Sequence, residues 1–261
     1  RSAGCEIIFP PKFGPLQDDE LTTGIAGMDA VLASLDAYSA PLLSSRAAGQ
    51  LKIIARWGVG YDSVDVAAAT QHGIVVTYTP GLLDNAVADY TFALMLSLAR
   101  RVHEVHVTMQ RGEWKNLWGT DVGGKTLGII GFGRIGKAVA HRAAGFNMRV
   151  LAHTTHPSAD NKDVEFVSLE KLLTESDFVS LHAALTPATR GMIGEAQLRQ
   201  MKRTAYLVNT GRGALLDETA PVRALNEHWI AGAALDEFTT EPLPADSAFR
   251  SAPNLLLSPH Q

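Results

Sequence analysis

The chain has 261 residues, a length that fits one large domain or two ordinary ones. Hydrophobic residues make up 46% of the chain and charged residues 19%, as in ordinary globular proteins, and the formal net charge of −4 argues against a broad surface for nucleic acids or anionic membranes. Cys5 is the only cysteine, which excludes an intrachain disulfide and leads us to expect the reducing cytoplasm.

Short apolar runs alternate with helical patterns along the whole chain, which is typical of βαβ units and parallel sheets. In the first part, strands are predicted at residues 7–9, 51–55 and 74–77. Helices are predicted at residues 28–35 and 64–72, and Gly73 is a natural stop for the second helix. Pro80-Gly81 predicts a turn at a domain boundary, so we expect domains of residues 1–79 and 80–261.

The second part begins with the most apolar predicted helix, residues 86–99, which Asp89 interrupts and which is too short to span a bilayer. We expect it to be buried or to form the interface of a homodimer. Strands are predicted at residues 126–130, 148–152, 178–181, 205–208, 232–235 and 255–257, and helices at 134–144, 169–175, 195–201 and 217–227. The predicted fold class is α/β with parallel sheets.

A glycine motif, Gly131-Phe-Gly133-Arg-Ile-Gly136, directly follows a predicted strand and opens a predicted helix. In this position Gly131 permits a tight turn, Gly133 lets the backbone approach a pyrophosphate, and Gly136 lets the helix pack against the sheet. The helix N-terminus offers N–H groups to phosphates. A glycine-rich turn without a ligand is the alternative; the context favours a dinucleotide site.

NAD-binding versions of this motif place a carboxylate at the end of the next strand, where it bonds the ribose 2′-hydroxyl. Here Thr154 stands at that position and Thr155 and His156 follow, with no acidic residue among them. The repulsion of a 2′-phosphate is therefore absent, although no arginine lies beside Thr154. We predict NAD(P) as the cofactor and favour NADP over NAD.

Three further polar motifs follow predicted strands: Asn209-Thr-Gly-Arg-Gly213, Ala234-Leu-Asp-Glu-Phe-Thr-Thr-Glu-Pro242, and Leu257-Ser-Pro-His260. Together with the glycine motif and in this order, they resemble the D-isomer-specific 2-hydroxyacid dehydrogenases, over residues 51–261. The resemblance implies two Rossmann-like domains, a substrate domain of flavodoxin-like type and a nucleotide-binding domain. It also implies hydride transfer between NAD(P)H and a small 2-keto or D-2-hydroxy acid such as glyoxylate, hydroxypyruvate or a phosphoglycerate-like acid.

The resemblance further implies the roles of individual residues. Arg212 would bind the substrate carboxylate and keto oxygen, His260 would transfer the proton, and Glu241 would pair with His260. The backbone of Val59 and Gly60 would offer N–H groups to the substrate carboxylate. The residues implied at the cofactor are Gly131, Gly133, Arg134, Ile135, Gly136, Thr154, His182, Thr210 and Asp236.

These residue types suit the reaction, because reduction of a keto group needs a proton at the carbonyl oxygen as the hydride arrives at carbon. A carboxylate beside a histidine favours the imidazolium form and raises its pKa. Arg212 keeps its charge and offers a planar fork that matches a carboxylate. For His182 a purely structural role is an equal alternative, and no metal is expected, since no ligand cluster shows suitable spacing.

The sequence also departs from the family pattern. Glu237 replaces a usual small apolar residue after Asp236, so its charge must reach solvent or find a partner. Ala184 replaces a usual proline near the cofactor. The leucine at position 82 resembles the residue of glyoxylate and hydroxypyruvate reductases more than that of phosphoglycerate dehydrogenases. Glu241 in place of glutamine disfavours a formate dehydrogenase. Family members extend beyond the positions equivalent to both ends, so we expect further residues in the natural polypeptide.

Two functions from different classes remain open at this point. One is an enzyme acting on a small 2-keto acid, with no nucleic-acid or membrane partner. The other is a dinucleotide-sensing, corepressor-like binding protein of the same fold with little or no turnover, since such proteins can keep the same motifs. Turnover with a panel of keto acids distinguishes the two.

Overall fold

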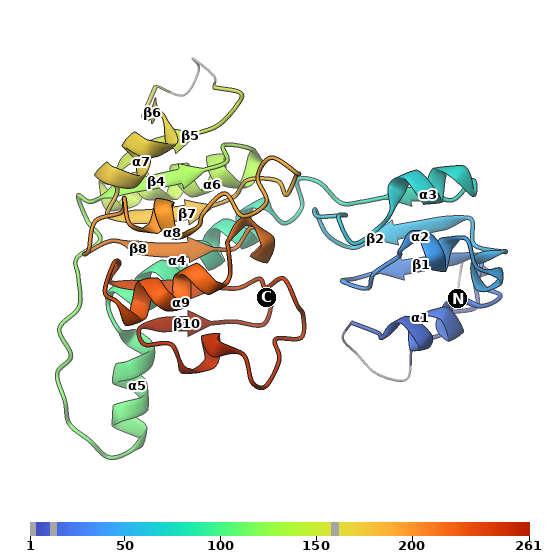
Figure 1. Ribbon diagram of the computed structural model, residues 1–261, viewed down its shortest axis with the longest axis horizontal. Coiled ribbons are helices and arrows are strands. Elements are labelled where there is room, and N and C mark those ends of the chain that lie inside the picture. Colours follow the sequence, from blue (N-terminus) through green and yellow to red (C-terminus); the bar gives the residue numbers. More distant parts are fainter. Residues whose placement is uncertain (1–3, 11–14, 158–161) are drawn as a thin grey trace. The chain divides into compact units, whose positions relative to one another are not determined.

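The structure is a computed structural model and describes residues 4–10, 15–157 and 162–261 (Figure 1). The chain divides into two compact units, Arg1–Leu83 and Asp84–Gln261. Each unit is built on a sheet of parallel strands, so the predicted α/β class is confirmed.

The first unit contains a three-stranded parallel sheet in the order β1-β2-β3. Its strands are β1 (Ala30–Ala33), β2 (Ile53–Arg56) and β3 (Val75–Thr77). Its helices are α1 (Asp18–Ile25), α2 (Ala40–Leu43) and α3 (Val66–Gln71), with a 3-10 turn, η1, at Arg46–Ala48. Leu21, Ile25, Leu43, Ile54 and Ala69 are among the buried residues that join these helices to the sheet.

Two predictions for this unit are wrong. Residues 28–35 contain good helix formers, yet Ala30–Ala33 form β1, because pairing with β2 satisfies their backbone groups and overrides the weak local preference. Residues 7–9 do not form a strand: Ile7, Ile8 and Phe9 are exposed, and no described strand pairs with them. An apolar run becomes a strand only where a neighbour accepts its backbone hydrogen bonds.

The second unit contains a seven-stranded sheet in the order β10-β9-β8-β7-β4-β5-β6, and every pair is parallel. The strands are β4 (Thr126–Ile130), β5 (Arg149–His153), β6 (Val164–Phe166), β7 (Phe178–Leu181), β8 (Tyr206–Asn209), β9 (Gly232–Leu235) and β10 (Leu255–Leu257). All but β6 were predicted. β6 escaped because it is only three residues long, lies at the sheet edge and carries the charged Glu165.

The strand order reverses beside β4, because the chain first adds β5 and β6 on one side and then β7 to β10 on the other. At such a reversal the connections after two neighbouring strands leave in opposite directions and open a crevice at their carboxyl ends. The glycine turn follows β4 and His182 follows β7, so both lie at this crevice.

Helices cover both faces of this sheet (Figure 1). One core contains residues of α4 (Asp84–Ala99) and α6 (Arg134–Ala143), and the other contains residues of α7 (Leu169–Glu175), α8 (Glu195–Leu198) and α9 (Thr219–Asn226). In β7, Phe178 faces the first core and Val179 the second, as the alternation of a strand requires. The described residues of the unit also form the 3-10 turns η2 (Ala144–Phe146), η3 (Gly213–Leu215) and η4 (Ala248–Ser251).

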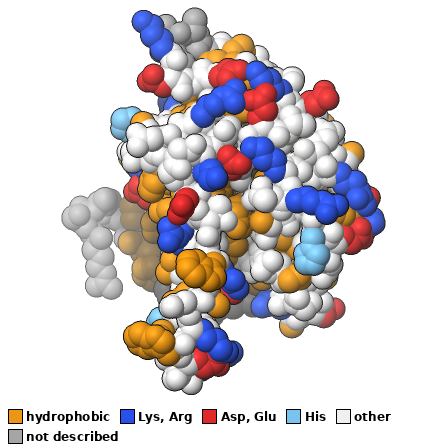
Figure 2. All heavy atoms as spheres, turned by 90° about the vertical axis from the view of Figure 1, so that its left-hand side faces the viewer, with side chains coloured by type: hydrophobic (Ala, Val, Ile, Leu, Met, Phe, Trp, Pro, Cys, Tyr) orange, Lys and Arg blue, Asp and Glu red, His pale blue; other side chains and the backbone are white. Residues whose placement is uncertain are grey.

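The predicted helix at residues 86–99 is α4, and it buries Phe92, Met95 and Leu98 within its own unit. It ends where Arg101 adopts φ 53, and α5 (Val102–Gln110) follows without any buried residue. Trp114 and Trp118, in the segment after α5, are 85% and 90% exposed. Figure 2, which views the molecule from the left-hand side of Figure 1, shows exposed hydrophobic side chains on the part that projects at the bottom of the picture. None of the described helices has both the length and the apolar character needed to cross a membrane.

Candidate active site

The glycine turn joins β4 to α6 at the centre of the second unit's sheet. Gly131 has φ +93, and a Cβ atom there would lie 2.4 Å from the backbone nitrogen of Ala183. A Cβ atom on Gly136 would lie 2.3 Å from the carbonyl oxygen of Gly131. Both residues must therefore be glycine, because only then can the turn, the helix α6 and the segment after β7 approach one another this closely.

Gly133 serves a different purpose, because a Cβ atom there would meet nothing within 4 Å. No side chain caps α6, so the backbone N–H groups of its first turn, which includes Arg134 and Ile135, are left for an outside acceptor. Open space beside uncapped N–H groups suits the pyrophosphate of a dinucleotide. The site fits the cofactor, while the individual contacts stay predictions.

Thr154 directly follows β5, beside the glycine turn that follows β4. Its hydroxyl accepts a hydrogen bond from the backbone N–H of His156 at 3.2 Å, and Thr155 Oγ1 lies 2.9 Å from His156 Nδ1. These neutral groups can bond either a ribose hydroxyl or a phosphate. No carboxylate occurs in residues 149–157.

His182 lies after β7, next to the glycine turn. Its Nε2 lies 2.8 Å from Ser180 Oγ, whereas its buried Nδ1 has no hydrogen-bond partner in the described part of the chain. Burial lowers the pKa of His182 to about 4, so the ring is neutral at physiological pH. An unpartnered polar atom at this crevice fits a ligand that brings its own polar group.

Thr210 and Asp236 follow β8 and β9 and are both buried. Thr210 Oγ1 lies 2.9 Å from Thr91 Oγ1 of α4, which ties the segment after β8 to that helix. The carboxylate of Asp236 accepts hydrogen bonds from Ser258 Oγ at 2.6 Å and from the backbone N–H of Gln261. Asp236 therefore also holds the segment that carries His260.

Arg212 is positioned by its neighbours in the Asn209–Gly213 motif. The side-chain amide of Asn209 donates to the Arg212 carbonyl at 2.9 Å and its oxygen accepts from the Gly211 N–H at 3.1 Å, which fixes the turn. A Cβ atom on Gly213 would lie 2.2 Å from the carbonyl carbon of Phe238. Glycine at position 213 thus brings the Arg212 turn against the segment that contains Glu237 and Glu241.

His260 and Glu241 lie in contact, with His260 Nδ1 2.8 Å from Glu241 Oε2. The other oxygen of Glu241 accepts the Phe238 N–H at 2.9 Å. His260 has φ 56, which is uncommon for a residue other than glycine, and its N–H donates to the Asp236 carbonyl at 2.9 Å. The surrounding contacts therefore fix the orientation of the imidazole.

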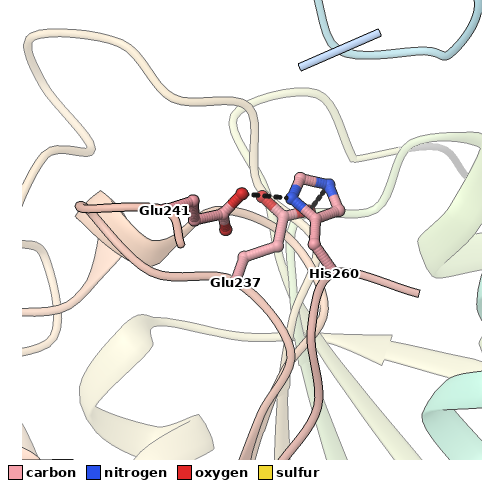
Figure 3. Close-up of side chains that lie close together, drawn as sticks. All are labelled: Glu237, Glu241 and His260. Carbon is pink, nitrogen blue, oxygen red and sulfur yellow. Dashed lines mark hydrogen bonds and ion pairs between the residues drawn. The ribbon is translucent and has the colours of Figure 1, made fainter. Parts of the chain in front are cut away.

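Glu237 is a site residue that the sequence analysis did not assign to the site. Both of its carboxylate oxygens lie 2.8 Å from Arg212 Nη1, and Oε1 lies 3.3 Å from His260 Nε2. Its side chain is only 7% exposed. Figure 3 shows His260 between the two carboxylates, with Glu237 beside Nε2 and Glu241 beside Nδ1. The sequence signal for this contact was a charged residue, Glu237, at a position where the family pattern has a small apolar one.

The charges of this cluster shift one another's proton affinity. Burial raises the pKa of Glu237 to about 7, although Arg212 and His260 oppose the rise. Burial alone would lower the pKa of His260, but the hydrogen bond to Glu241 and the charge of Glu237 raise it overall. For Glu241, burial would raise the pKa, and the hydrogen bonds from His260 and the Phe238 N–H lower it overall.

The remaining predicted residues, Val59 and Gly60, belong to the first unit and follow β2. The preceding Gly58 has φ +150, and its N–H donates to Thr79 Oγ1 at 3.1 Å. This positive φ favours glycine at position 58, where the loop packs beside the buried side chain of Arg56. Their contact with a substrate stays a prediction.

Glu237, Glu241 and His260 also offer one potential metal-ligand atom each, all within 4.8 Å of one another. Spacing along the sequence did not indicate this cluster. The guanidinium of Arg212, 2.8 Å from both Glu237 oxygens, already supplies a cation there and opposes a second one. The expectation of a metal-free site stays a prediction.

The chain is similar to known proteins of one enzyme family. Residues 92–261 match the family described as "D-isomer specific 2-hydroxyacid dehydrogenase, NAD binding domain". The chain is 52% identical over 223 residues to a glyoxylate reductase of Korarchaeum cryptofilum, covering 82% of this chain and 67% of that protein.

Solved structures share the fold as well. A glyoxylate reductase from Paecilomyes thermophila has a TM-score of 0.79 and 38% identity, covering 89% of this chain and 73% of its own. An NAD-dependent formate dehydrogenase from Staphylococcus aureus, in complex with NAD, has a TM-score of 0.85 and 34% identity, covering 93% of this chain and 75% of its own. The chain belongs to the D-isomer specific 2-hydroxyacid dehydrogenase family and is an oxidoreductase that transfers a hydride between NAD(P)H and a small 2-keto acid.

Proposed function

We propose that the chain is a glyoxylate or hydroxypyruvate reductase in which Arg212 binds the substrate carboxylate and His260 supplies the proton. The observation that carries this proposal is that the guanidinium of Arg212 and Nε2 of His260 both contact one carboxylate, that of Glu237. Two donors that meet on one carboxylate group are within reach of the two oxygen-bearing ends of a small 2-keto acid. The similarity to a glyoxylate reductase of Korarchaeum cryptofilum supports the substrate class.

In this proposal residues 1–79 form the substrate domain, with Val59 and Gly60 offering backbone N–H groups to the substrate. Residues 80–261 form the nucleotide-binding domain. Gly131, Gly133, Arg134, Ile135 and Gly136 hold the pyrophosphate, while Thr154, His182, Thr210 and Asp236 lie along the rest of the dinucleotide. When bound, the reduced nicotinamide supplies the hydride.

The protein's own residues would perform the remaining chemistry. Arg212 fixes the substrate carboxylate, and this orientation lowers the barrier by placing the keto carbon. His260 Nε2 donates its proton to the carbonyl oxygen as negative charge develops there. Glu241, 2.8 Å from Nδ1, stabilises the imidazolium before transfer and keeps the ring oriented afterwards. The keto acid gains one hydride and one proton and becomes the 2-hydroxy acid.

The main experiment measures oxidation of NAD(P)H with a panel of 2-keto acids, comparing the wild type with Arg212→Lys. Lysine cannot make the planar two-point contact, so we expect kcat/KM for glyoxylate to fall roughly 10- to 100-fold, the range for one charged hydrogen bond. Arg149→Lys is the matched control, because Arg149 is the first residue of β5 and so lies at the end of the strands opposite the site. Unchanged kinetics in Arg212→Lys would refute the assignment, and dinucleotide binding without turnover would favour a sensor.

The pH dependence of keto-acid reduction tests the role of Glu241. Reduction needs protonated His260, so activity is present at low pH and is lost as pH rises through the raised pKa of His260. Glu241→Gln removes the charge that raises this pKa, and we expect the fall in kcat/KM to move to lower pH. Glu175→Gln, at the end of α7, should leave the profile in place. An unmoved profile in Glu241→Gln would contradict the pairing.

We further propose NADP as the preferred cofactor, on the absence of a carboxylate after β5. We expect kcat/KM to be higher with NADPH than with NADH. Thr154→Asp should shift the preference towards NADH, because the new carboxylate repels a 2′-phosphate and can bond a 2′-hydroxyl. Thr154→Ser keeps a hydroxyl and should change the ratio little. A strong preference of the wild type for NADH would end this proposal.

We also propose a cytoplasmic homodimer, with no nucleic-acid or membrane partner. The predicted interface helix, α4, packs largely within its own unit, so the exposed hydrophobic residues after it are the better candidate surface: Val102, Val107, Met109, Trp114 and Trp118. Light scattering should give about twice the 28.0 kDa of one chain. The mass of a single chain at micromolar concentration would contradict a dimer.

A further inference from the structure

Glu237 has no part in the chemistry described above, although it lies between the two groups that perform it. It comes directly after Asp236, in the segment that follows β9. Its two oxygens lie 2.8 Å from Arg212 Nη1, and Oε1 lies 3.3 Å from His260 Nε2. At 7% exposure, its side chain has almost no contact with solvent. Its charge is therefore balanced by these two partners and not by water.

The donors that Glu237 contacts are limited in number. Arg212 Nη1 carries two N–H bonds; the Gly211 carbonyl accepts at 2.7 Å, and the Glu237 carboxylate accepts at 2.8 Å. Nε2 of His260, which can carry only one N–H bond, lies 3.3 Å from Oε1 of the same carboxylate. A 2-keto acid would present its carboxylate to the guanidinium and its carbonyl oxygen to the imidazole. Glu237 thus occupies a guanidinium nitrogen and lies beside the ring nitrogen that an anionic substrate held by Arg212 and His260 would also approach.

Resting on the proposed function, we propose that Glu237 competes with the substrate carboxylate for Arg212 and His260, so that a 2-keto acid anion binds well only when Glu237 carries a proton. With a substrate bound, three carboxylates, those of Glu237, Glu241 and the substrate, would share two cationic groups, Arg212 and protonated His260. The repulsion between these negative charges favours a proton on Glu237, the more buried of the two carboxyl side chains. Substrate binding would therefore be accompanied by proton uptake. Glu237 becomes a specificity-determining residue for the charge of the substrate.

The charged groups around Glu237 agree with such a proton-linked site. Arg212 and His260 stabilise the anion, Glu241 destabilises it, and burial destabilises it most. The resulting pKa of about 7 brings the protonation of Glu237 much closer to neutral pH than that of an exposed carboxyl group. An arriving anion adds a further negative charge and favours the protonated form. A proton, unlike a metal ion, can neutralise Glu237 without displacing the Arg212 cation.

The test measures binding of oxamate, a non-reducible analogue of a 2-keto acid anion, to the protein saturated with NADPH. For the wild type we expect the Kd of oxamate to rise as pH increases from 6 to 8.5, by up to tenfold per pH unit above the pKa of Glu237. Glu237→Gln keeps the shape but loses the charge. It should bind oxamate about tenfold more tightly than the wild type at pH 8, one unit above the pKa of about 7 of Glu237, and the two affinities should be closer at pH 6.

Glu218→Gln is the matched control, because the carboxylate of Glu218 also bonds this segment, at the Thr239 N–H, yet contacts neither Arg212 nor His260 in any described hydrogen bond. It should keep the wild-type pH dependence. Calorimetry in two buffers of different ionisation enthalpy counts the protons taken up on binding, and we expect Glu237→Gln to take up fewer than the wild type. Glu237→Val serves as a second variant if the glutamine variant fails to fold.

Weaker oxamate binding in Glu237→Gln, or an unchanged affinity and pH slope in both variants, would overturn the proposal. The first result would mean that Glu237 helps to hold Arg212 and His260 in place for the substrate. This readout requires no turnover. Failure of the proposed function would instead be recognised by unchanged keto-acid kinetics in Arg212→Lys, so the two failures are distinguishable.

Discussion

Because all seven strands of the second unit's sheet are parallel, their carboxyl ends lie on the same side of the sheet, and the candidate site depends on this constraint. The glycine turn follows β4, Thr154 follows β5, and His182 follows β7. Arg212, Glu237 and His260 follow β8, β9 and β10. Residues that are more than a hundred positions apart in the chain therefore come to the same side of one rigid layer.

Within that layer, the shape of each connection decides where the functional side chains lie. Gly213 permits the Arg212 turn to pack directly on the backbone of Phe238. Asp236 bonds Ser258 and the backbone of Gln261, so the segments after β9 and β10 are tied together. Glu241 then meets His260 from the same segment that carries Glu237. The polar residues around the site thus act as supports for Arg212 and His260.

The cluster of Arg212, Glu237, His260 and Glu241 gathers two carboxylates, a guanidinium and an imidazole in a mostly buried place. Each charge is tolerated because an opposite charge lies beside it. The carboxylate of Glu237 gives Arg212 and His260 an internal partner that resembles one end of a 2-keto acid. In the proposal above, a proton on Glu237 makes both groups available to the substrate.

The sequence by itself determined the α/β class, most strands of the second unit and the family, because these depend on local periodicity and on short motifs such as Gly131–Gly136. It misassigned residues 28–35 and 7–9, since strand formation there depends on a partner strand that local preference does not reveal. It identified Glu237 as a charge that needs a partner, but only the tertiary structure determined which one. The partner of Glu237 depends on the packing of Gly213 against Phe238 and on the segments after β8, β9 and β10, which all leave the sheet at the carboxyl ends of its strands. Such contacts between distant residues produce no periodic pattern in the sequence.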